Sequence, residues 1–295
     1  MEARKPRCSI LARICKIIMI QTAGHQLYQG EIMDISQFNP GMELKEKNHL
    51  SVSRTRKEPG VVCQMPKMFI FSDELPGWDK TEIWNYTTRR MDACFVMTRI
   101  EVRKGGGTMT PVNNGCENFF YVVSGTVTVS LPTKKCRLEK DGYCWIPPQM
   151  NFEMSQEEEE TATVLWIKKI YEPLEGIAVP EAASGNAKNL KAEESTAEFT
   201  KECLPASSDF GFDMSVNILI YYPGVTSERT EVHMSAHGAY ILEGRGDLAV
   251  NGTHYEAHEN DYFYIAPCAP HYTAAYAPKP LCILLFEEVN RDYAL

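Results

Sequence analysis

The chain of 295 residues has little of what a membrane protein or a nucleic-acid-binding protein needs. No apolar run approaches the roughly 18 to 20 consecutive residues of a membrane-spanning helix. Lysine and arginine form no clustered face, and the formal net charge is -9. Nucleic acid and anionic membrane surfaces both attract basic faces, so these absences exclude both as partners. We expect a small-molecule substrate instead.

The ten cysteines lack the spacing of a metal knuckle or of a small disulfide-rich domain. None forms a CxxC pair, and they are spread through strand-like segments. Free thiols indicate a reducing compartment, so we expect an intracellular, cytoplasmic protein.

Residues 1–60 differ in composition from the rest of the chain. Five basic residues and a single acid, Glu2, occur between Met1 and Lys16, and polar sequence without a regular pattern follows. This N-terminal extension is interpreted either as an organelle-targeting peptide or as a disordered tail.

Helical periodicity is missing from about Val61 to Tyr171, where short apolar runs alternate with turn residues, as is typical of β-strands, and the same strand pattern resumes at Gly211. The sequence predicts an all-β fold with β-domains at 61–171 and 211–295. The connector between them, 172–210, contains a helix-prone segment at 189–201. The predicted strands are 94–102, 118–123, 126–131, 143–146, 161–168, 215–222, 239–242, 247–250, 262–266 and 281–286.

The two β-domains are predicted to be copies of each other. The segment Tyr121-Val-Val-Ser-Gly125 matches Tyr240-Ile-Leu-Glu-Gly244, and a second pair of segments matches at a similar offset of roughly 120 residues. We expect two β-barrels that partly close their edges against each other. Exposed edge strands on such a pair favour a homo-oligomer.

Four side chains of the second copy are predicted to bind one divalent metal ion. Glu231, His233 and His237 lie within seven residues, and His271 follows in a proline-bounded turn. Residues two apart on a strand share a face, and a bend can add His237. Three nitrogens and one oxygen suit Mn²⁺ or Fe²⁺ best, with Ni²⁺ and Zn²⁺ as alternatives. Glu231 is also a candidate catalytic group, because a carboxylate can accept a proton.

The first copy is predicted to lack the metal. In the sequence alignment Asn118 stands where His237 stands, and Asn151 stands where His271 stands. Asparagine is a poorer ligand than imidazole for a transition metal.

Several motifs carry a resemblance to a known family. The Glu/His cluster and the Pro-x3-His turn resemble the cupin superfamily, and the duplication resembles a bicupin. Five further segments resemble the (S)-ureidoglycine aminohydrolase family, and the resemblance runs from about Val61 to the C-terminus. They are Tyr171-Glu-Pro-Leu-Glu-Gly176, Ser184-Gly-Asn-Ala187, Gly211-Phe-Asp-Met214, His237-Gly-Ala-Tyr-Ile-Leu-Glu-Gly244 and Asn290-Arg-Asp292.

The resemblance implies two cupin-type β-barrels and release of ammonia from ureidoglycine to give ureidoglycolate, in purine (allantoin) catabolism. It implies Mn²⁺ in the C-terminal cupin alone, with Glu231, His233 and His237 as ligands. The family's fourth ligand is typically glutamine, and His271 stands there in this chain. A nitrogen in place of that oxygen should shift selectivity toward iron, nickel or zinc.

Three pocket positions depart from the family pattern. Glu287 stands where the family has a lysine that helps hold the substrate, which makes Glu287 a second candidate catalytic or substrate-contacting residue. Leu248 and Ile283 stand where the family has tyrosines. One charge pair at about 4 Å is worth on the order of 4 kcal/mol at an effective dielectric near 20, so Glu287 bears directly on substrate choice.

Three functions therefore remain open from the sequence. The first is a metal-dependent aminohydrolase of the ureidoglycine type. The second is a bicupin dioxygenase or decarboxylase that acts on another small acid with its three-His, one-Glu site. The third is a bicupin that binds a metal or ligand without catalysis.

Overall fold

A computed structural model describes residues 54–195 and 197–289, which belong to one compact unit. The predicted N-terminal extension lies outside the described residues, except for residues 54–60. The described chain consists of strands and three single turns of 3-10 helix, η3 (Lys67–Phe69), η4 (Arg89–Met91) and η5 (Ala187–Asn189). None of the helices in this part of the chain has the length and hydrophobicity to cross a membrane.

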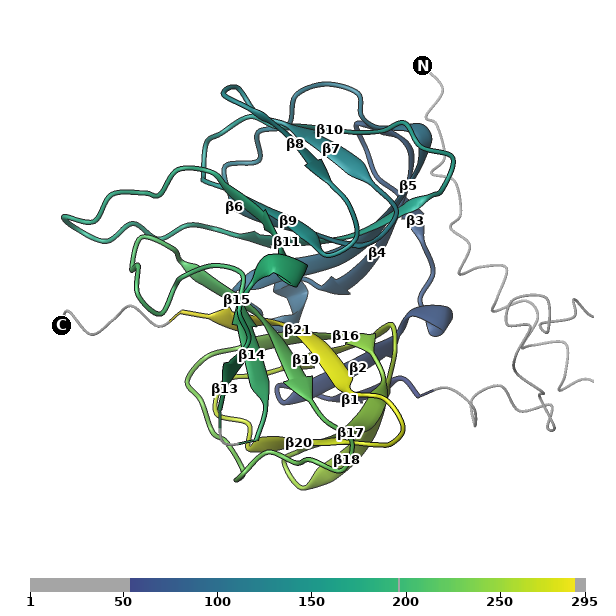
Figure 1. The fold of residues 1–295 in the computed structure, drawn as a ribbon, viewed down its shortest axis with the longest axis vertical. Helices are drawn as coiled ribbons and strands as arrows, with labels where there is room; N and C mark the ends of the chain where they lie inside the picture. The colour runs from purple at the N-terminus through teal and green to yellow at the C-terminus, as the bar shows by residue number, and fades with distance from the viewer. Residues whose placement is uncertain (1–53, 196, 290–295) are drawn as a thin grey trace, which may run out of the picture. The chain divides into compact units, whose positions relative to one another are not determined.

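The N-terminal repeat forms one sheet that closes into a barrel (Figure 1). The strands run in the order β12-β9-β6-β11-β5-β10-β7-β8, with β4 paired to β5 and β3 paired to β4. Their bounds are β3 (Asp73–Glu74), β4 (Trp78–Thr87), β5 (Phe95–Thr108), β6 (Glu117–Ser124), β7 (Val127–Ser130), β8 (Lys135–Leu138), β9 (Gly142–Ile146), β10 (Glu153–Gln156), β11 (Ala162–Lys169) and β12 (Ala183–Asn186).

The C-terminal repeat places an eight-stranded sheet against a three-stranded one. The larger sheet has the order β1-β2-β19-β16-β21-β15-β14-β13, and the smaller has the order β18-β17-β20. The bounds are β1 (Arg56–Glu58), β2 (Val62–Pro66), β13 (Glu193–Glu194), β14 (Phe199–Glu202), β15 (Met214–Tyr221), β16 (His237–Glu243), β17 (Arg245–Val250), β18 (Thr253–His258), β19 (Asp261–Ile265), β20 (His271–Ala275) and β21 (Leu281–Glu288).

The long central strands bury both of their faces, which explains why they read as continuous apolar runs. On β6, Phe120 and Val122 point into a core inside the N-terminal barrel, while Phe119 and Tyr121 join a core shared by both repeats. Successive side chains of a strand face opposite sides, so one strand serves two cores. A third core, which contains Ile241, fills the C-terminal barrel.

Aromatic rings from the two repeats pack directly against each other in the shared core. The ring of Tyr86 on β4 stacks on that of Tyr262 on β19, with centroids 4.8 Å apart. Phe95 on β5 packs on Phe286 on β21 at 4.0 Å. Gly238 on β16 leaves room for this packing, because an added Cβ would lie 2.9 Å from the Phe95 ring. The predicted all-β, two-barrel fold is confirmed, and the barrels share one core.

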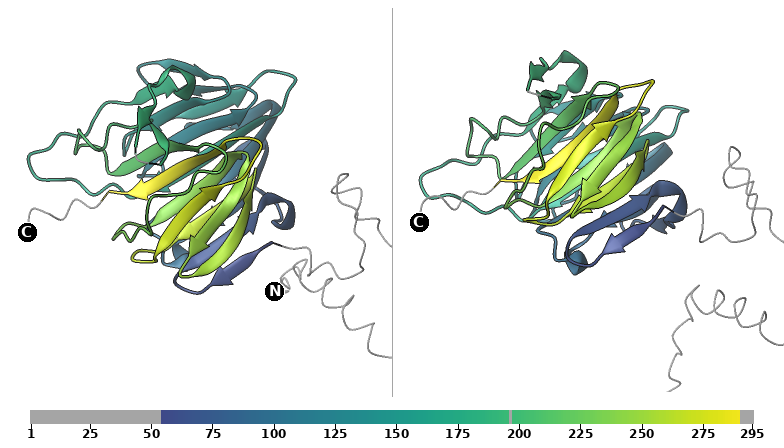
Figure 2. Two further views of the ribbon diagram at one scale, coloured as in Figure 1. Left: turned by 60° about the horizontal axis from the view of Figure 1, so that its bottom comes forward. Right: turned by 90° about the horizontal axis from the view of Figure 1, so that it is seen from below.

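The two repeats exchange edge strands. Strand β2, which precedes the N-terminal barrel, pairs with β19 of the C-terminal repeat, and β12, which follows that barrel, pairs back onto β9. The purple N-terminal strands lie beside the yellow-green C-terminal ones in Figure 2. Strand β12 lies in the predicted connector and pairs with the N-terminal barrel, so the exchange crosses the boundary predicted at 171/172. The predicted boundaries at 60/61 and 171/172 remain predictions. Strand β1 begins inside the stretch predicted to be irregular.

The helix-prone reading of 189–201 is wrong. This segment contains β13, most of β14 and the last residue of η5, and β14 pairs with β15. Local helix propensity is worth only a few tenths of a kcal/mol per residue, so an open sheet edge overrides it.

The cysteines in the described part of the chain are all free thiols, as predicted. They include the buried Cys144 and the exposed Cys268.

Candidate metal centre

The four predicted ligands come from three parts of the C-terminal repeat. Glu231 lies in the link between β15 and β16 and forms an isolated bridge with His271, the first residue of β20. Each donates its backbone N–H to the other's carbonyl, at 2.8 and 2.9 Å. The chain then bends at Met234 and Ser235 before His237 begins β16.

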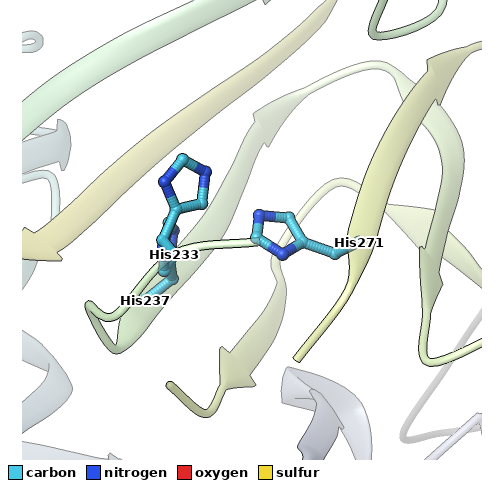
Figure 3. A group of neighbouring side chains, drawn as sticks. All are labelled: His233, His237 and His271. Carbon is cyan, nitrogen blue, oxygen red and sulfur yellow. The ribbon is translucent and has the colours of Figure 1, made fainter. Parts of the chain in front are cut away.

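Three imidazoles converge on one point (Figure 3). Each of His233, His237 and His271 offers one ring nitrogen, and these atoms lie within 4.8 Å of one another. The ring centroids are 5.2 Å apart for His233 and His237, 5.4 Å for His233 and His271, and 5.0 Å for His237 and His271. The fold thus brings His233 and His271 together, although they are far apart in the sequence.

The nitrogens of two rings are held ready to act as ligands. The buried Nε2 of His237 has no hydrogen-bond partner among the described residues. Burial, helped by His271 and His233, lowers the pKa of His237 to about 3, so its imidazole is neutral. The Nδ1 of His271 donates to the carbonyl of Ala269 at 2.8 Å, which leaves the Nε2 lone pair free.

Glu231 lies beside His233, although the group of converging ligand atoms contains the three histidines and not Glu231. Its Oε2 is 3.2 Å from Nε2 of His233. Two ligand atoms that each lie about 2.1 Å from one ion, at right angles, are about 3 Å apart. The unpartnered nitrogen, the oriented His271 and this spacing together fit a divalent metal ion. The side chains of His233 and Glu231 keep exposed fractions of 37% and 42%, so this side of the site is open to a substrate.

Comparison with known proteins places the chain in a family. A cupin domain model matches residues 217–287. The (S)-ureidoglycine aminohydrolase of Escherichia coli is 30% identical over 195 residues, which cover 65% of this chain and 74% of that protein. This chain belongs to the (S)-ureidoglycine aminohydrolase family. The resemblance predicted from the sequence is therefore confirmed.

Further relatives and solved structures are similar to this chain in sequence or in fold. The (S)-ureidoglycine aminohydrolase of Arabidopsis thaliana is 27% identical over 77% of this chain and 75% of its own length. The crystal structure of protein Ylba from E. coli has a TM-score of 0.75 at 26% identity, and the match covers 85% of this chain and 100% of that chain. Oxalate decarboxylase of Bacillus subtilis shares the fold, with a TM-score of 0.62 at 10% identity over 90% of this chain and 86% of its own.

In this ureidoglycine aminohydrolase family member, Glu287 lies next to the histidines. It is paired with His237 across β16 and β21, and directly paired residues project to the same face of a sheet. Burial raises the pKa of Glu287, the charge of Glu231 raises it further, and His233 opposes the shift. A raised pKa makes the Glu287 carboxyl a weaker acid than an exposed one and brings it closer to the range of a proton donor.

Two further groups near Glu231 were missed by the sequence reasoning. Tyr221 ends β15, and burial raises its pKa to about 12, with smaller contributions from the charges of Glu198 and Glu231. Glu198 comes from the predicted connector, and burial, together with Glu231, raises its pKa. Neither residue belongs to a recognisable motif, so only the tertiary structure could reveal it.

Leu248 and Ile283 lie in the apolar core of the C-terminal barrel. Each has an exposed fraction of 3%. They offer no hydrogen bond at the positions where the family pattern has tyrosines.

The equivalent site of the N-terminal repeat contains amides and an aromatic ring. Val112 and Phe152 form the bridge that corresponds to that of Glu231 and His271, with backbone bonds of 2.8 and 3.0 Å. Phe152 is thus the equivalent of His271, and the alignment of Asn151 with His271 is wrong by one residue. Aligning Ile146-Pro-Pro-Gln-Met-Asn151 with Ala266-Pro-Cys-Ala-Pro-His271 matches Pro147 to Pro267, whereas the strand register matches Pro148 to Pro267.

Asn118 is the equivalent of His237, as predicted, since the two occupy the same register against Ile146 and Ile265. The Asn118 and Asn114 side chains are hydrogen-bonded to each other at 2.8 and 3.2 Å. Trp166 Nε1 also donates to Asn118, at 3.0 Å. These amides satisfy one another, which is consistent with a structural role for the site. The absence of a metal there remains a prediction.

Proposed function

We propose that this chain is a metal-dependent (S)-ureidoglycine aminohydrolase. Its substrate would be the small molecule ureidoglycine, which water converts into ureidoglycolate and ammonia. The observation that carries the proposal is the convergence of His233, His237 and His271, with Glu231 beside His233, in a chain of the aminohydrolase family.

The four side chains would hold one divalent ion, which we propose to be Mn²⁺ because the ligand set mixes nitrogen and oxygen. His271 adds a third nitrogen, so Fe²⁺, Ni²⁺ and Zn²⁺ are expected to compete. A bound ion of this kind supplies Lewis-acid polarisation to a substrate oxygen or nitrogen.

Two carboxyl groups would move the protons. Glu231 accepts the proton of the attacking water, because a carboxylate with a half-exposed side chain can act as a base. Glu287, whose pKa burial raises, would deliver a proton to the amine as it leaves as ammonia. The exchange consumes one water and releases one ammonia. The buried Leu248 and Ile283 would keep one wall of the site apolar.

The test is ammonia release from freshly generated ureidoglycine by the full chain loaded with Mn²⁺. We expect release well above the spontaneous rate, and we expect His233→Ala to reduce it to that rate. Asn118→Ala, at the equivalent position to His237 in the other repeat, serves as the matched control and should retain activity. If the unmodified chain released ammonia no faster than ureidoglycine does spontaneously, the proposal would be overturned.

A second candidate is a bicupin dioxygenase or decarboxylase, favoured by His271, which makes the site three-His, one-Glu. Oxygen uptake with Fe²⁺ or Ni²⁺ across a panel of small acids would support it. Stoichiometric metal in a protein that is silent in both assays would support the third candidate, a non-catalytic binder.

We also propose an intracellular homo-oligomer. Strand β8 ends the N-terminal sheet, and β1 and β13 end the C-terminal sheet. Unpaired strand edges are ready templates for pairing with another copy. Light scattering on the full chain tests this, and a monomer mass at micromolar concentration would refute it.

A further inference from the structure

A separate cavity of about 410 Å³ lies between the two barrels. Small-molecule sites commonly fall within roughly 300 to 1,000 Å³. Val123, Ile218, Ile220 and Leu242 give it an apolar lining. None of the three histidines lines it, and Leu242 is five positions along β16 from His237, about 16 Å at strand spacing.

Equivalent positions of the two repeats line this cavity from opposite barrels. Several lining residues fall into pairs at the same offset at which the strand registers of the repeats match. The pairs are Arg99 and Ile218, Val123 and Leu242, Ser124 and Glu243, Lys140 and Glu259, and Asp141 and Asn260.

The chemistry of the two walls has diverged at these positions. The N-terminal repeat contributes Lys140 where the C-terminal repeat contributes Glu259, and Ser124 is matched by Glu243. At these two positions the first wall is basic or neutral and the second is acidic. At another pair the order is reversed, with Asp141 matched by the neutral Asn260, so the lining as a whole carries both signs of charge and suits a ligand that does the same.

Four of the charged lining groups, Arg99, Asp141, Lys188 and Glu243, already have partners. These partnerships are Arg99 with Glu101 at 2.9 Å, Lys188 with Asp141 at 3.5 Å, and Glu243 with Lys279 at 3.2 Å. Lys140, Lys201 and Glu259 have no ion pair with another described residue, although Lys201 Nζ donates to the Ala187 carbonyl at 3.1 Å. The cavity thus presents two cations and one anion to a ligand.

We propose that this cavity binds a small amino dicarboxylate. Its two carboxylates would face Lys140 and Lys201, and its ammonium group would face Glu259. Opposite charges of matching number give complementarity, and hydrogen bonds to charged partners are stronger than those between neutral groups. The apolar lining contacts the carbon chain. The ligand touches β16 and β21 at the ends opposite to those that carry His237 and Glu287.

Calorimetric titration of the metal-loaded full chain with L-aspartate tests the proposal. We expect saturable binding with one ligand per chain. Lys201→Met should weaken it about tenfold or more. Lys135→Met serves as the matched control, because Lys135 on β8 is an exposed lysine that does not line the cavity, and this variant should bind as the unmodified chain does.

Two further comparisons separate this site from the metal centre and test the role of Glu259. His233→Ala should retain aspartate binding, and Glu259→Gln should weaken aspartate without weakening succinate, which lacks the ammonium group. Should Lys201→Met fail to fold in a thermal melt, Lys140→Met at an exposed position replaces it. Failure of aspartate to bind, or binding lost in His233→Ala and kept in both lysine variants, would overturn the proposal. Equal losses of aspartate and succinate in Glu259→Gln would overturn the assigned ammonium contact.

Discussion

The neutral His237 makes the metal-free protein sensitive to acid in a calculable way. Its pKa falls from the ordinary value of 6.5 to about 3 in the fold. Below pH 6.5 His237 therefore binds a proton in the unfolded chain but not in the folded chain. The free energy of unfolding decreases as the pH falls, and this decrease ends near pH 3. One pKa unit corresponds to about 1.4 kcal/mol, so His237 alone removes about 2 kcal/mol between pH 7 and pH 5.

His237→Gln removes the titrating group and keeps a neutral polar side chain at the site. We expect urea unfolding of the metal-free protein to show a loss of free energy between pH 7 and pH 5 that is about 2 kcal/mol smaller in this variant. Other titrating groups, such as Glu287, act in both proteins and cancel to first order in the comparison. Equal pH dependence in the two proteins would refute the neutral, buried state of His237.

Three other outcomes are expected. His233→Ala should lose its bound metal in elemental analysis while Asn118→Ala keeps about one ion per chain, and equal metal content would contradict the assigned site. Glu287→Gln should lower turnover. In the unmodified enzyme the rate should decline with rising pH as the Glu287 carboxyl, whose pKa is raised, loses its proton, and this decline should be absent from the variant. An unchanged pH profile would show that Glu287 does not donate the proton. Gly238→Ala should destabilise the fold by about 1 to 3 kcal/mol, because its Cβ would meet the Phe95 ring at 2.9 Å. An unchanged urea midpoint would show that the shared core can rearrange around the added methyl group without loss of stability.

The sequence predicted that the candidate ligands lie close together because most of their spacing is local, and the structure brings the three histidines together. Glu231, His233 and His237 lie within seven residues, and His271 was recognisable from its proline-bounded turn. The repeat could also be recognised from the sequence, since similar five-residue segments begin at Tyr121 and Tyr240. Both features can be recognised in short, continuous segments of the sequence.

The missed features depend on contacts between distant segments. Nothing local in Glu198 predicts that it approaches Glu231, and β2 gives no sign that it pairs with β19 near the other end of the chain. The helix-prone connector became strand β14 because β15 offered an open edge. Asn151 was mistaken for the equivalent of His271 because consecutive prolines allow two alignments, and only the backbone register decides between them.

The exchange of strands β2 and β12 bears on how this chain can evolve. Neither repeat contains all the strands of its own sheet, so a gene cut between the repeats would encode two halves with missing edges. A mutation that unfolds one barrel also removes a strand from the other, so both should unfold in one cooperative step. Selection on the histidine site therefore preserves the N-terminal repeat as well. The chain therefore needs its N-terminal repeat to complete the sheet that carries the histidines, although Asn118 and Phe152 stand there at the positions equivalent to His237 and His271.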